Sequence, residues 1–166
     1  MGLLRMAIHR CFVGEVTFLS TDESVTDGLV TLQERTVNLI NQLTMPVVEV
    51  GLVVQKHLNG LMDTLTEHVH LQGGTLPDNV AKPWPLDEDG AESNANFSLD
   101  KVMDIVDHQR MDILDTLIRV TLMEININVL EAVLALRSWE KLVRTQLAAA
   151  TGPGQLFSPL AIPDDW

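Results

Sequence analysis

Apolar residues recur at every seventh position along residues 98–150, and this spacing limits the fold more than any other feature of the sequence. The series consists of Leu99, Val106, Ile113, Val120, Ile127 and Leu134. A seven-residue apolar repeat is typical of helices that pack along a coiled-coil seam. Ser98 is a favourable N-terminal cap, and the run Gly152-Pro153-Gly154 ends the helical pattern. The sequence therefore predicts one straight helix over residues 98–150, with these six residues on an oligomer seam.

Asn126 and Asn128 interrupt the apolar character of this region. Together with Ile125 and Ile127 they alternate with a period of two, which is locally a strand pattern inside a helical context. Two interpretations remain open for the asparagines. They either bridge neighbouring helices and fix their register, or they are ordinary surface residues.

Residues 21–72 also follow a helical period, with apolar residues three or four positions apart. Pro46 lies in the middle of this region and lacks the N–H that a helix interior requires. The helix either kinks at Pro46, or one helix stops there and another starts with proline in its first turn. The sequence thus predicts a kinked helical arm over residues 21–72.

Residues 73–97 form a linker between the two helical regions. Gly73 and Gly74 favour a helix end, and Pro77, Pro83 and Pro85 prevent a regular helix. A linker of this length suits a strap along the helices or a solvated loop. We therefore expect a mainly α fold: a long helical hairpin that forms a coiled-coil-like bundle, with extended N- and C-terminal arms. A two-layer hairpin leaves apolar surface exposed, which predicts self-association.

The two ends of the chain differ in composition from the helical regions. Residues 1–20 contain a partly alternating, β-branched stretch and are predicted to be an arm with a short strand. Residues 151–166 are irregular and apolar, and dock either on their own chain or on a partner. The residues predicted to dock on a partner are Phe157, Leu160, Ile162 and Trp166.

The charge and cysteine content exclude several classes of protein. The formal net charge of -12 argues against a nucleic-acid binder, which needs a basic face. The single cysteine, Cys11, excludes an intramolecular disulfide framework. Glu15 interrupts the apolar stretch near the N-terminus, so no signal peptide is expected, and no apolar run is long enough for a membrane span. We expect a cytoplasmic protein, or one incorporated into a virion or another large assembly.

Few residues suggest chemistry. His68 and His70 could bind a transition metal if the backbone were extended there, because residues two apart then share a face, whereas on a helix they diverge. Asp104 and His108 are a weaker candidate, since their spacing differs from that of metal-binding bundles. No catalytic motif and no phosphate-binding loop are present in the sequence. Neither an enzyme nor a resident cofactor is expected, apart from a metal at His68 and His70.

These observations favour a non-enzymatic structural protein, an oligomeric subunit of a larger complex. The favoured setting is a virion-type fibre, collar, connector or decoration component, with further copies of the chain (dimer or trimer) and other structural proteins as partners. The alternative is a binding or regulatory module that presents a helical groove to a protein partner. A metal-binding helical bundle is the third hypothesis.

Overall fold

The computed structural model describes residues 23–87 and 98–166, and this part of the chain is mainly helical, as predicted. The predicted N-terminal arm and short strand, residues 1–20, lie outside the described residues. The helices are α2 (Glu23–Gln42), α3 (Val47–Leu71), α4 (Asp78–Ala81), α5 (Leu99–Ile105), α6 (His108–Ile125), α7 (Val129–Ala148) and α8 (Pro153–Leu156).

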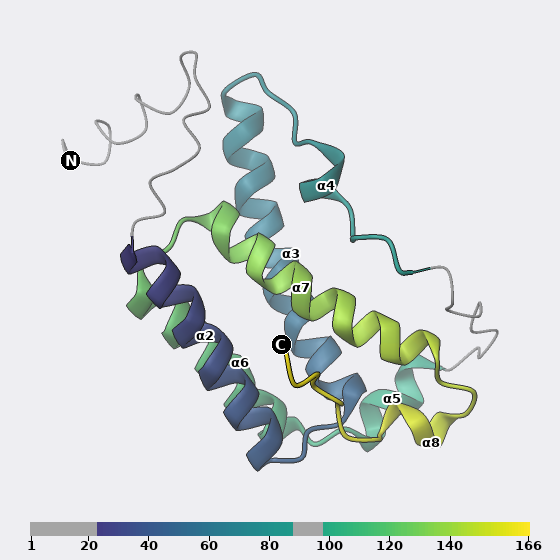
Figure 1. Cartoon of the computed structure of the whole chain (residues 1–166). Helices are drawn as coiled ribbons and strands as arrows, with labels where there is room; N and C mark the ends of the chain where they lie inside the picture. Colours follow the sequence, from purple (N-terminus) through teal and green to yellow (C-terminus); the bar gives the residue numbers. More distant parts are fainter. Residues whose placement is uncertain (1–22, 88–97) are drawn as a thin grey trace.

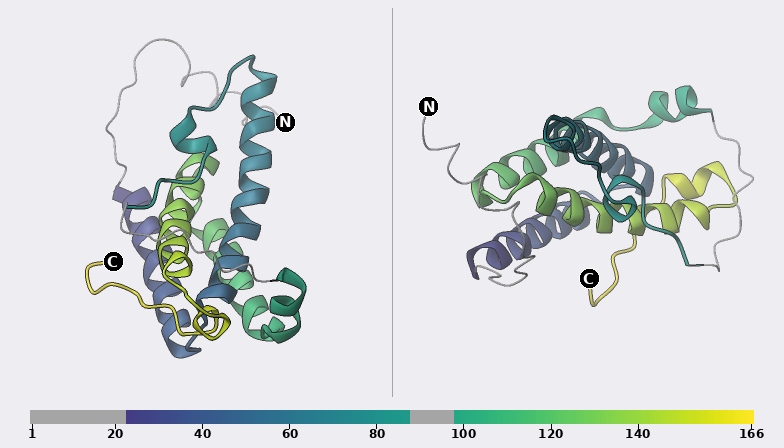
Figure 2. Two further views of the ribbon diagram at one scale, coloured as in Figure 1. Left: turned by 90° about the vertical axis from the view of Figure 1, so that its right-hand side faces the viewer. Right: turned by 90° about the horizontal axis from the view of Figure 1, so that it is seen from above.

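Four long helices form the bundle, and they pack as two pairs. Helix α6 lies alongside α2, and α7 crosses α3 (Figures 1 and 2). Helix α6 also contacts α3 and so joins the two pairs. Helices α2 and α3 diverge from the turn that connects them, in the shape of a V (Figure 1). The described part of residues 21–72 therefore forms two separate helices rather than the predicted single kinked arm, because the chain reverses direction between them (Figure 1).

The main core lies where α3, α6 and α7 meet. Its fully buried side chains include Val50, Leu58, Leu114, Ile118 and Trp139. A second, smaller cluster of apolar side chains lies between the start of α3, α5 and α8. One chain thus buries a complete core without a partner, which is the main source of its stability.

Residues 43–46 turn the chain between α2 and α3. Thr44 adopts a left-handed backbone conformation with φ of 48°, which ends α2 sharply. Pro46 is the N-cap residue of α3, with an extended backbone. Of the two possibilities left open at Pro46, the structure shows the second, since one helix stops and another starts. The proline stands one position before the helix rather than in its first turn.

The predicted continuous helix over residues 98–150 is wrong, because the chain breaks twice within it. At the first break Val106 is extended, and Asp107 caps α6 by accepting a hydrogen bond from the Arg110 amide at 3.0 Å. At the second break Asn126 is left-handed, with φ of 49°. Asn128 and Glu131 then form a capping box that starts α7. The asparagines therefore end one helix and begin the next, a role that neither earlier interpretation assigned to them.

The described part of the predicted linker forms a strap along α7. Gly73, with φ of 74°, ends α3 as expected. Arg137 of α7 is buried, pairs with Glu140 at 2.6 Å and donates to the carbonyls of Val80 and Ala81. Arg144 of α7 donates to the Trp84 carbonyl at 2.7 Å. Three backbone carbonyls of the strap thus accept hydrogen bonds from arginines, which explains how a proline-rich stretch keeps one path.

The C-terminal tail packs against its own chain. The amide of Leu160 donates to the Met45 carbonyl at 2.9 Å, and the amide of Val47 donates to the Ser158 carbonyl at 3.0 Å. Trp166 makes an edge-to-face contact with Trp139, with ring centroids 5.3 Å apart. The tail thereby covers the turn between α2 and α3.

Helices α3 and α7 approach closely at Gly51. A Cβ atom at this position would lie 2.8 Å from Cγ1 of the buried Val143. Gly60, on the same helix, has no heavy atom within 4 Å of the corresponding position. Substitution of Gly51 therefore tests close packing, whereas substitution of Gly60 tests helix propensity alone.

We predict opposite effects for alanine at these two glycines. Gly60→Ala should stabilise the fold by about 1 kcal/mol, because alanine favours the helix. Gly51→Ala should destabilise it by about 1–2 kcal/mol, because overpacking costs more than the propensity gain. Urea unfolding followed by circular dichroism measures both changes. Equal stabilisation by the two variants would contradict the close α3–α7 packing.

Candidate functional site

Helix α6 presents an exposed apolar stripe, which we call the α6 face: Ile113, Leu117 and Val120 of α6 with Leu39 of α2. Ile113 and Val120 are 44% and 39% exposed. Spacings of four and three residues place the α6 members on one side of the helix. They line a shallow groove of about 270 Å³, together with Arg35, Thr116 and Thr121. The adjacent side of α6, about 100° round the helix, is buried through Leu114 and Ile118.

The structure places the six predicted seam residues on different elements. Ile113 and Val120 share the α6 face, as their spacing requires. Leu99 is exposed at the start of α5, Val106 is buried in the second cluster, and Ile127 lies between α6 and α7. Leu134, on α7, is 37% exposed. The prediction of a single six-residue seam along one helix is therefore wrong, because the two helix breaks change the direction of the chain.

A buried ion pair fixes the start of α6 against α3. Arg110 of α6 donates to Glu49 of α3 through Nε at 2.6 Å and Nη2 at 2.7 Å. Glu49 also accepts a hydrogen bond from the Asp107 amide at 2.9 Å. The Glu49 side chain is only 1% exposed, so its charge depends on these donors. Hydrogen bonding to Glu49 raises the pKa of Arg110, which stays charged.

Two further polar contacts hold the rest of α6. In its middle, Asp115 Oδ1 lies 2.9 Å from Nζ of Lys56 and 3.1 Å from Nε2 of His57, and neither contact is aligned as a hydrogen bond. Near its end, Glu124 pairs with Arg35 of α2. Helix α6 is thus held by charged side chains from both neighbouring helices, and the orientation of the α6 face follows from these contacts.

His57 lies in the contact between α3 and α6 and is partly buried. Desolvation by burial is the largest influence on its imidazole and disfavours the charged form. It outweighs the opposing attraction of Asp115, so the pKa of His57 is lowered from 6.5. This histidine is accordingly favoured in its neutral form in the folded protein.

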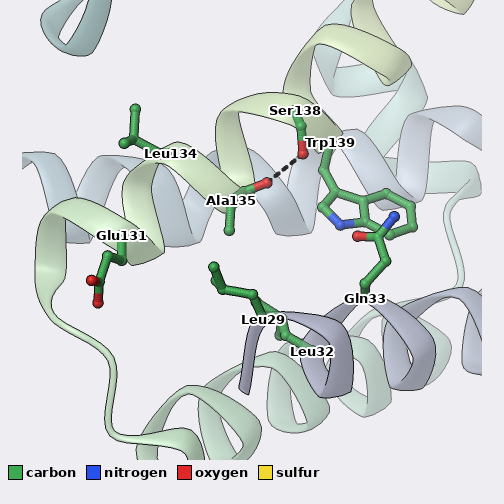
Figure 3. A pocket seen from close by; sticks show the side chains of 8 residues that line it. All are labelled: Leu29, Leu32, Gln33, Glu131, Leu134, Ala135, Ser138 and Trp139. Atoms are coloured by element: carbon green, nitrogen blue, oxygen red, sulfur yellow. Dashed lines mark hydrogen bonds between the residues drawn. The ribbon is translucent and has the colours of Figure 1, made fainter. Parts of the chain in front are cut away.

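A second groove, which we call the α2–α7 groove, lies between those two helices. Leu29 and Leu32 form one wall, and Leu134 and Ala135 form the other (Figure 3). Gln33 and Trp139 lie together at one end, and Glu131 lies at the other (Figure 3). The groove has a volume of about 290 Å³ and is lined almost wholly by apolar atoms. Its chemistry suits an apolar side chain rather than a charged ligand.

The predicted metal ligands are not brought together. His68 and His70 are exposed and both belong to the last turns of α3. Two residues apart on a helix, they point in nearly opposite directions, so they do not chelate one ion within one chain. Asp104 and His108 lie on either side of the break between α5 and α6. Within residues 23–87 and 98–166, no group of three or more His, Cys, Asp or Glu side chains is arranged to hold a metal.

The four tail residues predicted to dock on a partner pack against their own chain instead. Leu160 is 5% exposed, and Ile162 and Trp166 contact the main core. Phe157 contacts the second cluster. Docking on the same chain was the other alternative from the sequence, and it explains how an irregular apolar tail is shielded from water.

The polar residues that hold α6 were missed in the sequence. Glu49 and Arg110 are far apart along the chain, and a spacing rule detects only neighbours on one element. Glu49 did carry one signal, as an acid within the most apolar stretch of the sequence, residues 47–54. A buried carboxylate requires a cationic partner, and that requirement could have directed attention to Arg110.

Comparison of the chain with protein-family models, with curated proteins and with solved structures found no match. Within the described residues, none of the helices combines the length and the apolar character that crossing a membrane requires.

We predict that Arg110→Met destabilises the fold by about 3 kcal/mol, because it leaves the buried Glu49 carboxylate without its cation. Adding Glu49→Met should recover part of this loss, since the double variant buries no unpaired charge. Chemical unfolding of both variants measures the difference. A double variant less stable than Arg110→Met would show that the carboxylate is not the source of the cost.

We also predict a pH dependence of stability that originates at His57. The pKa is lowered in the folded chain, so the unfolded chain binds the proton more readily. This contribution to stability is fully present above pH 6.5 and decreases as the pH falls below it. His57→Gln should flatten the dependence in thermal unfolding from pH 7.5 to 5, a range chosen around the ordinary histidine pKa of about 6.5.

His68→Gln, at an exposed position on the same helix, controls for the substitution itself. If His57→Gln and the unmodified chain lost the same stability over this range, burial of His57 would not be the cause.

Proposed function

We propose that this chain is a non-enzymatic structural protein, a helical-bundle subunit that associates with further copies of itself through the α6 face. The observation that carries the proposal is the exposure of Ile113 and Val120, two large apolar side chains on one side of α6, next to the side that Leu114 and Ile118 bury in the core. They are seven residues apart, with Leu117 between them, which is the spacing of a helix that packs along a partner helix.

The rigid placement of α6 supports this proposal. The contacts of Glu49, Asp115 and Glu124 hold the helix along its length. A face that is fixed before association loses little conformational entropy when a second copy binds. The α6 face therefore has the preorganised character that an assembly surface needs.

The setting that we favour is a virion or a comparable large assembly, in which the chain serves as a fibre, collar, connector or decoration subunit. This setting is favoured because a small helical subunit with an exposed apolar face suits repeated packing of identical copies. The net charge of -12 opposes close packing through self-repulsion, so added salt should favour assembly.

The alternative, a binding or regulatory module, would use the same face for a different protein. It predicts a chain that remains a monomer by itself, whereas the structural proposal predicts a dimer or trimer. The absolute mass in solution therefore distinguishes the two.

We expect light scattering after size-exclusion chromatography to give a multiple of 18.4 kDa at moderate salt. Val120→Glu should shift the chain to a monomer, because it places a charge within the apolar α6 face. Leu71→Glu is the matched control, since Leu71 is 81% exposed at the end of α3 and outside the α6 face. Circular dichroism checks that both variants remain folded.

A monomeric wild-type chain at the highest concentration measured would overturn self-association. An oligomer that persists in Val120→Glu and dissociates in Leu71→Glu would place the interface elsewhere.

A further inference from the structure

The α2–α7 groove remains open among the described residues. Leu134, on its wall, is 37% exposed, and the Trp139 ring forms its inner end (Figure 3). Exposed apolar grooves of this kind are usually covered by another segment. The described helices and the docked C-terminal tail leave it uncovered, so its occupant has to come from elsewhere.

Residues 1–22 precede α2, which forms one wall of this groove. Leu29 is six residues beyond Glu23, or about 9 Å along the helix axis. Residues 20–22 can span about 10 Å when extended. Leu19 can therefore reach the near end of the groove, beside Leu29 and Glu131, without any displacement of α2.

Residues 16–19, which lie within this distance of the groove, have the apolar composition that the groove requires. Val16, Phe18 and Leu19 are apolar, and Thr17 lies between them. The groove wall from Glu131 to Trp139 is eight residues of helix, or about 12 Å. Four extended residues cover about 13 Å, so residues 16–19 match its length.

Charge also favours this segment. Residues 1–14 contain Arg5 and Arg10 and no acidic residue, whereas the chain as a whole has a net charge of -12. Glu131 lines the groove, and Glu34 is exposed on α2 beside the groove residue Gln33. Glu15 separates this stretch from residues 16–19, and Arg5 and Arg10 before it would lie over an acidic surface.

We propose that residues 16–19 of the chain's own N-terminal segment occupy the α2–α7 groove in an extended conformation, with Val16 and Phe18 on one face as the apolar contacts. The direct connection to α2 gives this segment a high effective concentration at the groove, which a second copy or another protein has to exceed. The contact is separate from the α6 face and does not depend on self-association.

Disulfide trapping in the full-length chain tests this contact. In a Cys11→Ser background, Val16→Cys, on the face that the proposal turns to the groove, is combined with Gln33→Cys or with Ser138→Cys, one position on each helix of the groove. Glu34→Cys is the matched control, because it is adjacent to Gln33 in sequence but outside the groove lining. A disulfide forms readily only where the two Cα atoms come within about 7 Å.

We expect an intramolecular disulfide under mild oxidation in both groove pairs, formed several-fold faster than in the Glu34→Cys control. Adding Phe18→Ser should reduce the rate to that of the control, because it removes the main apolar contact. Non-reducing electrophoresis and mass spectrometry identify the products.

Two results would overturn the proposal. Equal rates at Gln33 and Glu34 would show that the segment does not occupy the groove. A disulfide formed between two chains, rather than within one, would assign the groove to a second copy. Neither result bears on the α6 face, whose test is the mass of Val120→Glu.

Discussion

The buried ion pair between Glu49 and Arg110 is the interaction on which the placement of α6 depends. One carboxylate accepts two hydrogen bonds from the guanidinium and a third from the backbone at the start of α6. Because that carboxylate is almost wholly buried, an arrangement that separates it from these donors costs about 3 kcal/mol. The pair therefore sets where α6 begins on α3, and with it which side of α6 faces α2 and which side remains exposed.

Local signals in the sequence predicted the helical class and several helix ends. Gly73 ends α3, and Pro46 marks the start of that helix. The prediction failed over residues 98–150, where the seven-residue repeat outweighed local evidence. Asn128 and Glu131 have the spacing of a capping box, which is itself a signal for a helix start. The seven-residue spacing runs across both helix breaks, although some of its members are buried and others are exposed. Spacing alone does not distinguish a buried apolar residue from an exposed one.

The candidate surface was predictable only in part. Ile113 and Val120 follow directly from the repeat, because residues on one unbroken helix keep their mutual spacing. Which of the other four seam residues are buried, exposed or between helices could be known only from the tertiary fold. The same holds for the contacts of Arg110 and Asp115, since each joins helices that are distant along the chain. The docking of Leu160 could not be decided from its apolar character, which suits its own chain and a partner equally.

The pairing of the tail with the turn between α2 and α3 has a consequence for the order of folding. Residues 158 and 160 form two backbone hydrogen bonds with residues 47 and 45, which lie far earlier in the sequence. During synthesis from the N-terminus, that turn can form its local hydrogen bonds, such as Met45 N–H to the Ile40 carbonyl, but it lacks the two from the tail until every described helix has been made. The V formed by α2 and α3 is thus completed after translation of the bundle, and the high sequence separation of these contacts favours slow closure of the native state.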